Sequence, residues 1–188
     1  MKLIVLTAPS GAGKTTIARR LMAAVPGLRF SVSATTRSPR AGETDGVDYH
    51  FLSVGAFSER LDAGDFVEHE EVYPGRFYGT LAPELERLAA SEGTRAVVLD
   101  VDVKGAASVK RLYGDRALTL FIQPPSLDAL ADRLRARGTE SDAQVATRLA
   151  RAEMEMRAAP SFDAVVVNDR LEEAVAETVA RVVAFLDS

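Results

Sequence analysis

Apolar residues gather in four short runs, with longer stretches of mixed character between them. The runs are Leu3–Thr7, Ala96–Val101, Leu118–Ile122 and Ala164–Val167. Each is nearly continuous in Val, Ile and Leu instead of alternating with polar residues, which is typical of strands buried on both faces. The pattern therefore predicts a sheet in the interior of the protein.

Helical periodicity appears between or after these runs. The predicted helices are Lys14–Ala24, Pro83–Ala90, Leu127–Arg137, Asp142–Ala158 and Leu171–Leu186. Ser141 and Gln144 have the spacing of a capping box at the start of the fourth helix. The last helix has an apolar stripe made of Val175, Val179, Val182 and Leu186, which we expect to pack on the sheet. Strands alternating with helices predict an α/β fold, with a parallel sheet covered by helices on both sides.

Two segments differ from this alternating pattern. Residues 31–82 are rich in Gly, Thr, Pro and aromatic residues and contain short alternating pieces, so we expect a small β-rich insertion there. Residues 126–157 are helical and rich in Arg, which suggests a mobile lid. We expect both segments at the carboxyl ends of the core strands, where open α/β sheets bind ligands.

Composition narrows the class of protein. A chain of 188 residues with 47% hydrophobic residues is expected to form one compact core. The sequence has no Cys, no apolar run of about 20 residues and no signal-peptide pattern, which favours a cytoplasmic protein without a membrane span. The net charge of −4 argues against a nucleic-acid binder. An anionic ligand must therefore meet local clusters of Arg and Lys.

The clearest chemical motif follows the first strand and leads into the first helix. The segment Ala8-Pro-Ser-Gly-Ala-Gly-Lys-Thr15 matches G-x-x-x-x-G-K-[ST] except at its first position. Gly11 and Gly13 allow the backbone to bring its N–H groups close to an anion. Lys14 adds a positive charge for the outer phosphates, and the Thr15 hydroxyl is a candidate Mg²⁺ ligand. A glycine-rich turn with an unrelated lysine is the alternative, but the flanking strand and helix favour a nucleoside triphosphate site.

A second group of candidates lies in Ser33-Ala-Thr-Thr-Arg-Ser-Pro-Arg40. Arg37 and Arg40 can present forked donors to one phosphate. The same residues also fit a solvated loop in which the arginines pair loosely with Glu43 or Asp45. The residues alone leave both interpretations open.

The segments Phe66-Val-Glu-His69 and Gly75-Arg-Phe-Tyr-Gly-Thr80 hold further candidates. A buried Glu68 carboxylate could accept two hydrogen bonds from a base edge with adjacent N–H donors, which guanine has and adenine lacks. An exposed loop or helix-end position for Glu68 is the alternative. Tyr49 and Tyr78 could donate to a phosphate, although most tyrosines are packing residues.

Acidic residues end the second apolar run. Asp100 and Asp102 are two residues apart, so we expect them to share one face of a strand. An acid at such a strand end commonly helps to hold Mg²⁺ through water. A turn with a capping Asp is the alternative.

The predicted lid carries Arg133, Arg135, Arg137 and Arg148. Arg133 and Arg137 are four residues apart, a like-charge spacing that is mildly unfavourable on a helix. Arg133, Arg137 and Arg148 lack a carboxylate at i±4, which suits an anion supplied from outside, such as ATP phosphates on lid closure. Arg135 is expected on the other face.

These motifs together resemble those of guanylate kinases, and the resemblance covers almost the full length. Besides the loop, it rests on Val32–Glu43, Gly46–Tyr49, Phe66–Glu68, Phe77–Thr80, Leu99–Asp102, Gly105, Pro124–Ser126 and Val167–Asp169. The alanine at the first loop position is normal for that family. The segment Val72-Tyr-Pro-Gly-Arg-Phe-Tyr78 departs from the commoner pattern by one extra residue, with Pro74-Gly75 as a turn.

The resemblance implies a P-loop NTPase three-layer fold with a central parallel sheet. It also implies a core of residues 1–31, 94–125 and 158–188, a GMP-binding insertion at 32–93 and a helical lid at 126–157. The implied reaction transfers the γ-phosphate of ATP to GMP, giving ADP and GDP in purine metabolism. The acceptor phosphate is already anionic, so no general base is required.

The family's roles carry over to individual positions. For ATP they imply Ala8, Pro9, Ser10, Gly11, Ala12, Gly13, Lys14, Thr15, Thr16, Arg137, Arg148 and Asn168. For GMP they imply Ser33, Arg37, Arg40, Tyr49, Glu68, Tyr78, Thr80 and Asp102. The implied catalytic residues are Lys14, Arg37, Arg137 and Arg148, and Mg²⁺ would be held by Thr15 and Asp100.

The expected partners are ATP and GMP, with dGMP as a possible further acceptor. Neither nucleic acid nor membrane is expected as a partner, and the chain is expected to be a monomer or a homodimer. Two other functions stay open on the sequence: a P-loop kinase for a different small acceptor, and a non-catalytic guanylate-kinase-like module that binds peptides.

Overall fold

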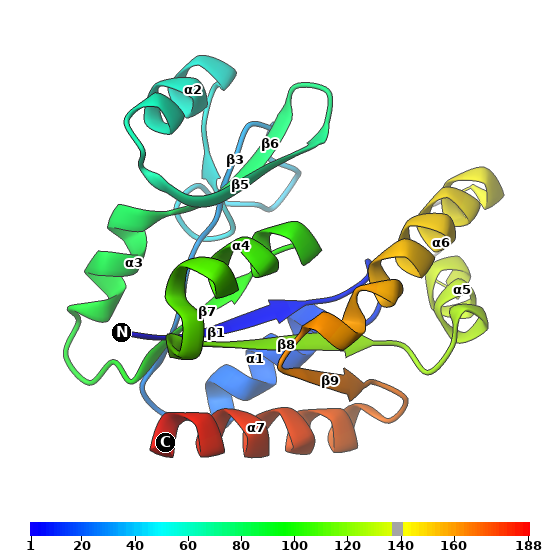
Figure 1. The fold of residues 1–188 in the computed structure, drawn as a ribbon. Coiled ribbons are helices and arrows are strands. Elements are labelled where there is room, and N and C mark those ends of the chain that lie inside the picture. Colours follow the sequence, from blue (N-terminus) through cyan, green and yellow to red (C-terminus); the bar gives the residue numbers. More distant parts are fainter. Residues whose placement is uncertain (137–140) are drawn as a thin grey trace. The chain divides into compact units, whose positions relative to one another are not determined.

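The computed structural model describes residues 1–136 and 141–188 (Figure 1). The chain divides into two compact units. Unit 1 contains Met1–Val5 and Gly27–Ala117, and unit 2 contains Leu6–Pro26 and Leu118–Ser188. No helix in the described ranges is long and apolar enough to cross a membrane.

A five-stranded sheet confirms the predicted central parallel sheet. Its strands are β1 (Lys2–Thr7), β2 (Leu28–Phe30), β7 (Ala96–Asp100), β8 (Ala117–Gln123) and β9 (Ala164–Val167), in the order β2-β7-β1-β8-β9. The β2–β7 and β8–β9 pairs are parallel. Leu3, Ile4, Val5 and Leu6 are completely buried, as expected for a strand covered on both faces. All four strands predicted from apolar runs are present within a residue or two.

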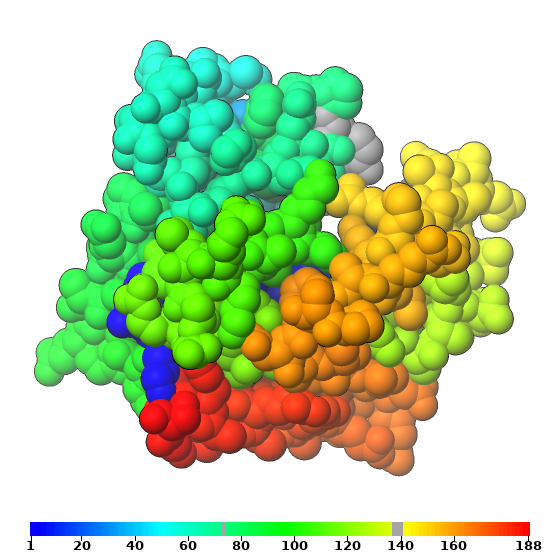
Figure 2. All heavy atoms as spheres, viewed as in Figure 1, coloured from blue at the N-terminus to red at the C-terminus, as the bar shows by residue number. Residues whose placement is uncertain are grey.

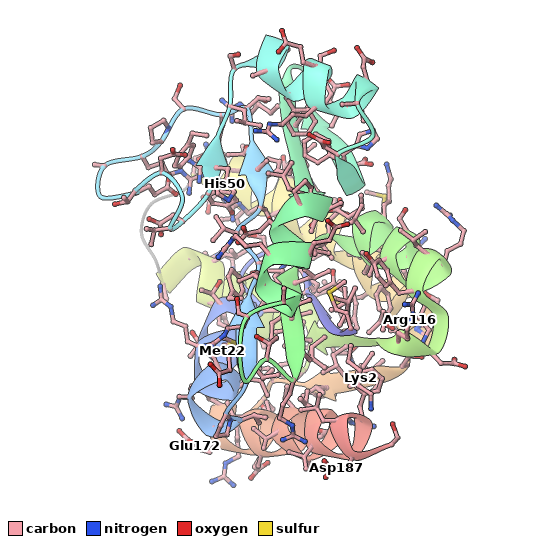
Figure 3. The ribbon with its side chains drawn as sticks, turned by 90° about the vertical axis from the view of Figure 1, so that its left-hand side faces the viewer. Lys2, Met22, His50, Arg116, Glu172 and Asp187 are labelled. Carbon is pink, nitrogen blue, oxygen red and sulfur yellow. The ribbon has the colours of Figure 1, made fainter. Side chains whose placement is uncertain are left out.

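Helices of unit 2 pack against its strands. They are α1 (Lys14–Ala24), α5 (Leu127–Ala136), α6 (Asp142–Arg157) and α7 (Leu171–Asp187), with a 3₁₀ turn at Ala159–Ser161. Ile17 of α1, Ile122 of β8, Val166 of β9 and Ala174 of α7 form one buried cluster. At the surface, Arg20 of α1 donates to both carboxylate oxygens of Glu172 at 2.5 and 2.6 Å. Glu172 lies in the first turn of α7, at the opposite end of that helix from Asp187 (Figure 3), so the pair joins α1 to the start of α7.

The buried face of α7 is turned slightly from the predicted stripe. Ala174, Thr178 and Val182 are buried, whereas the predicted Val175 and Val179 are only partly buried. Thr178 can lie at the centre because its hydroxyl donates to the carbonyl of Ala174 at 2.7 Å. The opposite face of α7 is exposed and forms a continuous red strip in Figure 2.

Helices α5 and α6 pack on each other through a small apolar cluster. Leu130 and Leu134 of α5 meet Val145 and Ala152 of α6. The predicted capping box is confirmed: Ser141 accepts from the Gln144 amide, and Gln144 Oε1 accepts from the Ser141 amide at 2.8 Å. The last residue of the predicted Leu127–Arg137 helix, Arg137, lies outside the described residues.

Unit 1 contains a second sheet, which accounts for the β-rich character expected of residues 31–82. Its strands are β3 (Ala34–Thr35), β4 (His50–Phe51), β5 (Phe66–Tyr73) and β6 (Arg76–Leu81), in the order β4-β3-β6-β5. Helices α2 (Val54–Asp62), α3 (Ala82–Ala89) and α4 (Val103–Tyr113) and a 3₁₀ turn at Gly114–Arg116 complete the unit. Phe57 of α2 stacks on Phe66 with ring centroids 4.3 Å apart and anchors a buried cluster with Ala34 and Leu81.

Two of these helices, α2 and α4, are absent from the sequence prediction. The buried face of α4 consists only of Gly105, Ala106 and Val109. Such small side chains allow the helix to lie close to its neighbours. They also give a weak hydrophobic periodicity in the sequence, because that signal depends on large apolar residues at helical spacing.

Candidate active site

The loop between β1 and α1, here called the phosphate loop (residues 8–15), has a backbone that only glycine adopts easily. Gly11 and Gly13 have φ angles of 97° and 98°. The Ala12 amide donates to the Pro9 carbonyl at 3.0 Å and closes a turn. Helix α1 begins at Lys14 without a side-chain cap, so the N–H groups of its first turn have no intrahelical acceptor. Such a helix start is a ready anion site.

A buried amide supports the phosphate loop from behind. Asn168 is 5% exposed and donates from Nδ2 to the Ala12 carbonyl at 2.7 Å. A Cβ atom at Gly13 would overlap the Asn168 amide nitrogen. Arg133 in turn donates to the Asn168 carbonyl at 2.8 Å. The observed role of Asn168 is to brace the loop, and its predicted contact near adenine stays a prediction.

The side chains around the loop come from α1 and α6. Lys14 is the first residue of α1, and Thr15 and Thr16 follow it with exposed side chains. Arg148 of α6 donates to Ser10 Oγ at 2.7 Å, so one predicted lid arginine contacts the loop directly. The other, Arg137, lies outside the described residues.

The remaining two arginines of the predicted lid have structural partners. Arg133 is tied to the backbone of Asn168, as described above. Arg135 pairs with Asp132 at 3.7 Å on the exposed side of α5, as expected for a surface position. Of Arg133, Arg135 and Arg148, it is therefore Arg148 that donates a hydrogen bond to the phosphate loop.

In unit 1, Arg37 is held by a carboxylate from the same loop. Its two terminal nitrogens each donate to a Glu43 oxygen at 2.6 Å, and its side chain is 9% exposed. Arg37, and then the Arg40 amide at 2.7 Å, lower the pKa of Glu43 to about 2. The same pair raises the pKa of Arg37. The sequence alternative in which Arg37 pairs with Glu43 is thus present in the structure, but the ion pair is bidentate and tight instead of loose.

Aromatic side chains surround this pair. The Arg37 guanidinium lies 4.8 Å from the ring centroid of Tyr49, and the Tyr49 and Tyr78 rings meet edge to face at 5.9 Å. Burial, followed by the charge of Asp100, raises the pKa of the Tyr49 hydroxyl. Tyr49 therefore stays a neutral donor next to Arg37 at physiological pH.

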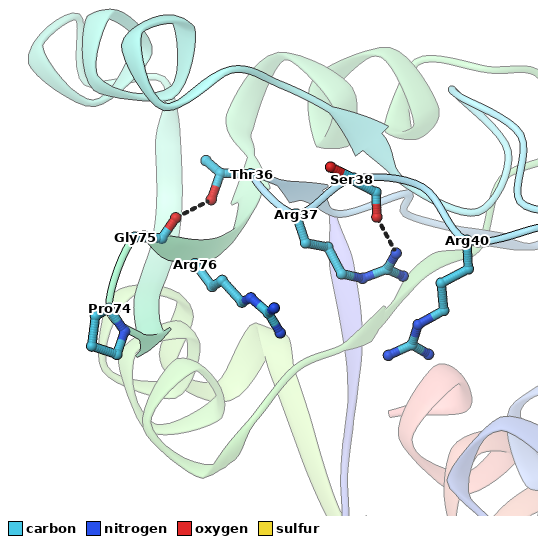
Figure 4. Close-up of a pocket in the computed structure, with 7 residues that line it drawn as sticks. All are labelled: Thr36, Arg37, Ser38, Arg40, Pro74, Gly75 and Arg76. Atoms are coloured by element: carbon cyan, nitrogen blue, oxygen red, sulfur yellow. Dashed lines mark hydrogen bonds between the residues drawn. The ribbon is translucent and has the colours of Figure 1, made fainter. Parts of the chain in front are cut away.

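A cavity of about 490 Å³ opens beside these residues (Figure 4). We call it the arginine pocket, and its lining consists of Thr36, Arg37, Ser38, Arg40, Pro74, Gly75 and Arg76. Three of the seven lining residues are arginines, and none carries a carboxylate. The pocket is electrostatically suited to a phosphate.

Glu68 lies on β5 and is buried, with 8% exposure, so the exposed alternative is wrong. Thr80 of the neighbouring strand donates to Glu68 Oε1 at 2.6 Å. The carboxylate packs so closely on α4 that a Cβ atom at Gly105 would overlap its other oxygen. Burial, with the nearby charge of Asp102 adding to it and the Thr80 hydrogen bond opposing it, raises the pKa of Glu68 to about 7.

The prediction that Asp100 and Asp102 share one strand face is wrong. Strand β7 ends at Asp100, and the chain then turns into α4. Asp102 is the N-cap of that helix and accepts a hydrogen bond from the Gly105 amide at 2.7 Å. The capping alternative therefore holds for Asp102, because a helix start needs an acceptor for its first amides.

No group of three or more His, Asp or Glu residues suited to a metal occurs in the described part of the chain. A Thr hydroxyl and an Asp carboxylate are oxygen donors of the kind Mg²⁺ prefers, together with phosphate and water oxygens. Thr15 belongs to unit 2 and Asp100 to unit 1, so their joint binding of Mg²⁺ stays a prediction.

Three residues at the site have no role among the sequence predictions. Gly105 allows Glu68 to approach α4, and a glycine three residues after a capping Asp, in the first turn of a helix, is the signal that could have indicated this. Thr36 holds the Pro74-Gly75 turn against the loop that carries Arg37 and Arg40, because its Oγ1 donates to the Gly75 carbonyl at 2.9 Å. Arg76 lines the arginine pocket. It lies in the segment Val72–Tyr78, which is one residue longer than the common family pattern, and this extra residue is the signal that could have indicated it.

Comparisons with known proteins agree on one family. The guanylate kinase family model matches residues 1–184. The guanylate kinase of Salinibacter ruber is 59% identical over 99% of this chain and 97% of that protein. The guanylate kinase of Chlorobium chlorochromatii is 49% identical over 98% of this chain and 96% of that protein.

Solved structures extend this result. The guanylate kinase of Anaplasma phagocytophilum matches with a TM-score of 0.74 at 30% identity, covering 99% of this chain and 84% of that one. A shikimate kinase from Bacteroides thetaiotaomicron, at 21% identity and a TM-score of 0.52, shares the fold alone. From its sequence motifs, its fold and these relatives, the chain belongs to the guanylate kinase family.

Proposed function

We propose that this chain transfers the γ-phosphate of ATP to GMP and releases ADP and GDP. The proposal is supported by relatives named guanylate kinase at 46 to 59% identity over nearly the full chain. The observation that carries it in the structure is the buried Glu68 carboxylate in the same unit as the arginine pocket. A buried acceptor pair for a base and a cationic cavity for a phosphate are what a nucleoside monophosphate requires.

Base recognition is assigned to Glu68 and its neighbours. The carboxylate accepts from N1–H and the 2-amino group of guanine, whereas adenine offers no such pair of donors. Thr80 donates to one oxygen of this buried carboxylate at 2.6 Å and fixes its position. Ser33 and Asp102 complete the proposed guanine set. The acceptor phosphate is assigned to Arg37, Arg40, Tyr49 and Tyr78.

ATP is assigned to the phosphate loop and the residues around it. The loop amides and the start of α1 bind the phosphates, and Lys14 neutralises the outer ones. Thr15 and Thr16 supply hydroxyl groups, and Arg148 reaches the loop at Ser10. Arg137, outside the described residues, completes the family's pair of lid arginines.

Catalysis consists of alignment and charge neutralisation. The attacking group is a phosphate oxygen that is already ionised near neutral pH, so no residue has to remove a proton. Lys14, Arg37, Arg148 and the loop amides reduce repulsion between two anions and stabilise charge on the transferred group. Mg²⁺, bound with ATP, supplies further neutralisation of the phosphates, with Thr15 and Asp100 as the proposed protein ligands.

Other assignments stay predictions of the same proposal. They are acceptance of dGMP, a monomeric or homodimeric state, a cytoplasmic location and the absence of a nucleic-acid partner. No feature of residues 1–136 and 141–188 favours a different acceptor or a non-catalytic peptide-binding module.

The test is a coupled assay of ADP formation from ATP with GMP, AMP, UMP or CMP as acceptor. We expect turnover with GMP and at least a hundredfold lower kcat/KM with the other three, since none of their bases offers the buried Glu68 carboxylate two adjacent N–H donors. Comparable rates with AMP or UMP would show that another kinase activity is present. Absence of turnover with all four would instead favour a binding module.

A further inference from the structure

The tip of the β5–β6 hairpin brings a third arginine to the arginine pocket. Arg76 is the first residue of β6 and directly follows the Pro74-Gly75 turn. In Figure 4 its guanidinium points into the same space as those of Arg37 and Arg40. The segment that is one residue longer than the common family pattern therefore places a charged side chain, that of Arg76, in the arginine pocket.

Hydrogen bonds hold the hairpin tip in place. Gly75 has a φ angle of 74°, and its amide donates to Glu71 Oε1 at 2.8 Å. Thr36 Oγ1 donates to the Gly75 carbonyl at 2.9 Å and accepts from the Phe77 amide at 2.9 Å. Thr36 immediately precedes Arg37, so the backbone of Arg76 is tied to the loop that carries the other two arginines.

The three guanidinium groups differ in how much charge they can offer to a ligand. Both terminal nitrogens of Arg37 are already bonded to Glu43. Arg40 and Arg76 are exposed, and within the described ranges no side-chain hydrogen bond or ion pair engages Arg76. The other nearby carboxylate, that of Glu71, accepts from the Gly75 amide. Among the described residues neither Arg40 nor Arg76 forms an ion pair, so a phosphate dianion in this pocket meets two guanidinium groups that no carboxylate contacts directly.

We propose that Arg76 binds the 5′-phosphate of the acceptor nucleotide together with Arg40, while the Arg37–Glu43 pair positions the phosphate between them. This inference rests on the proposed function, because it names a further ligand of the same substrate. Guanidinium groups that reach the pocket from strand β6 and from the loop after β3 suit a tetrahedral dianion, whose oxygens point in different directions. Arg76 therefore contributes to the preference for a phosphorylated acceptor over the bare nucleoside.

The experiment compares GMP and guanosine binding by calorimetric titration to wild-type protein, Arg76→Gln and Arg76→Lys. We expect Arg76→Gln to weaken GMP binding about tenfold, the usual size of a charge-assisted hydrogen bond, and to leave guanosine binding within about twofold. Arg76→Lys should fall between the two, since it keeps the charge but loses the fork. Arg111→Gln, an equally exposed charge removal on α4, should change neither affinity.

Two results would overturn the inference. One is a GMP affinity of Arg76→Gln equal to that of the wild type. The other is an equal loss of GMP and guanosine affinity, which would show that the substitution acts on the base site or the fold and not on the phosphate. Failure of the proposed function looks different, because the wild-type protein itself would then neither bind nor phosphorylate GMP.

Discussion

The phosphate loop of unit 2 and the arginine pocket of unit 1 both receive phosphate in the proposed reaction, but they are built in different ways. The loop uses backbone: two glycines with positive φ, the uncapped start of α1 and one buried amide that braces it. The pocket uses side chains, with three arginines, a carboxylate clamp on one of them and a threonine that ties two loops together.

The difference has consequences for how each site responds to change. A backbone site has little room for adjustment, because a single Cβ at Gly13 would overlap Asn168. A side-chain site can gain or lose one contact at a time, as the position of Arg76 at a hairpin tip illustrates. We therefore expect substitutions in the loop to lower turnover by orders of magnitude, and substitutions in the pocket to change acceptor affinity in smaller steps.

The largest effect is expected for Lys14→Ala. Removal of the ammonium group should lower kcat about 100- to 1000-fold, because charge on the transferred phosphoryl group would lose a preorganised cation. GMP affinity should change by less than about twofold, since Lys14 belongs to the other unit from the proposed GMP residues. Steady-state kinetics and a GMP titration measure the two quantities separately.

A variant that keeps near-normal turnover would contradict the assignment of the loop. Lys2→Ala, a lysine substitution on β1 before the loop, is the matched control and should leave kcat within about twofold.

The next effect tests the base site. Glu68→Gln should weaken GMP binding by about 2–3 kcal/mol, because an amide donor would then face a guanine donor in a buried site. Glu59→Gln, on the exposed surface of α2, is the control for charge removal. Calorimetric titration gives both affinities, and an unchanged Kd for Glu68→Gln would refute guanine recognition by this carboxylate.

Much of the backbone site could be predicted from the sequence, because its signals are local. The phosphate loop lies between a run of buried apolar residues and a helix, and Gly11 and Gly13 show where φ must be positive. The capping box at Ser141 and Gln144 is equally local and is confirmed. Asn168 shows the limit: its bond to Ala12 spans 156 residues, so only the fold reveals the brace.

The side-chain site was less predictable for the same reason. The Arg37–Glu43 pair could be proposed, but its bidentate geometry depends on how the loop folds around Tyr49. Asp102 was predicted on a strand because α4 has too few large apolar residues to be predicted as a helix from its sequence. Burial of Glu68 depends on Gly105, which is distant in sequence and adjacent in space.

A pair of glycine substitutions separates backbone strain from packing in the loop. Gly13→Ala should lower the free energy of unfolding by about 2 kcal/mol or more, because a Cβ both disfavours its φ of 98° and overlaps Asn168. Gly42→Ala has a similar φ of 87° but open space around it, so about 1 kcal/mol is expected. Denaturant titrations compare the two. Equal losses would mean that the contact with Asn168 contributes nothing beyond strain.

The smallest effect is a pH dependence that belongs to the base site alone. Burial raises the pKa of Glu68 to about 7, so a growing fraction of the carboxyl is protonated in the free protein as the pH falls below 7. Guanine needs the ionised form, so affinity should be highest above pH 7 and decline below it. Between pH 8 and pH 6 the Kd should rise about tenfold.

Guanosine is the appropriate ligand for this measurement, because it lacks the phosphate whose own pKa near 6 would add a second pH dependence. Glu68→Gln should abolish the dependence, since the amide does not titrate in this range. A Kd for guanosine that stays constant from pH 6 to pH 8 in the wild type would mean that Glu68 is ionised throughout. The effect of burial on the pKa of Glu68 would then be offset by a stronger hydrogen bond than the one from Thr80. In that case the side-chain site would be as insensitive to pH as the backbone site, and the two sites would differ only in how they are built.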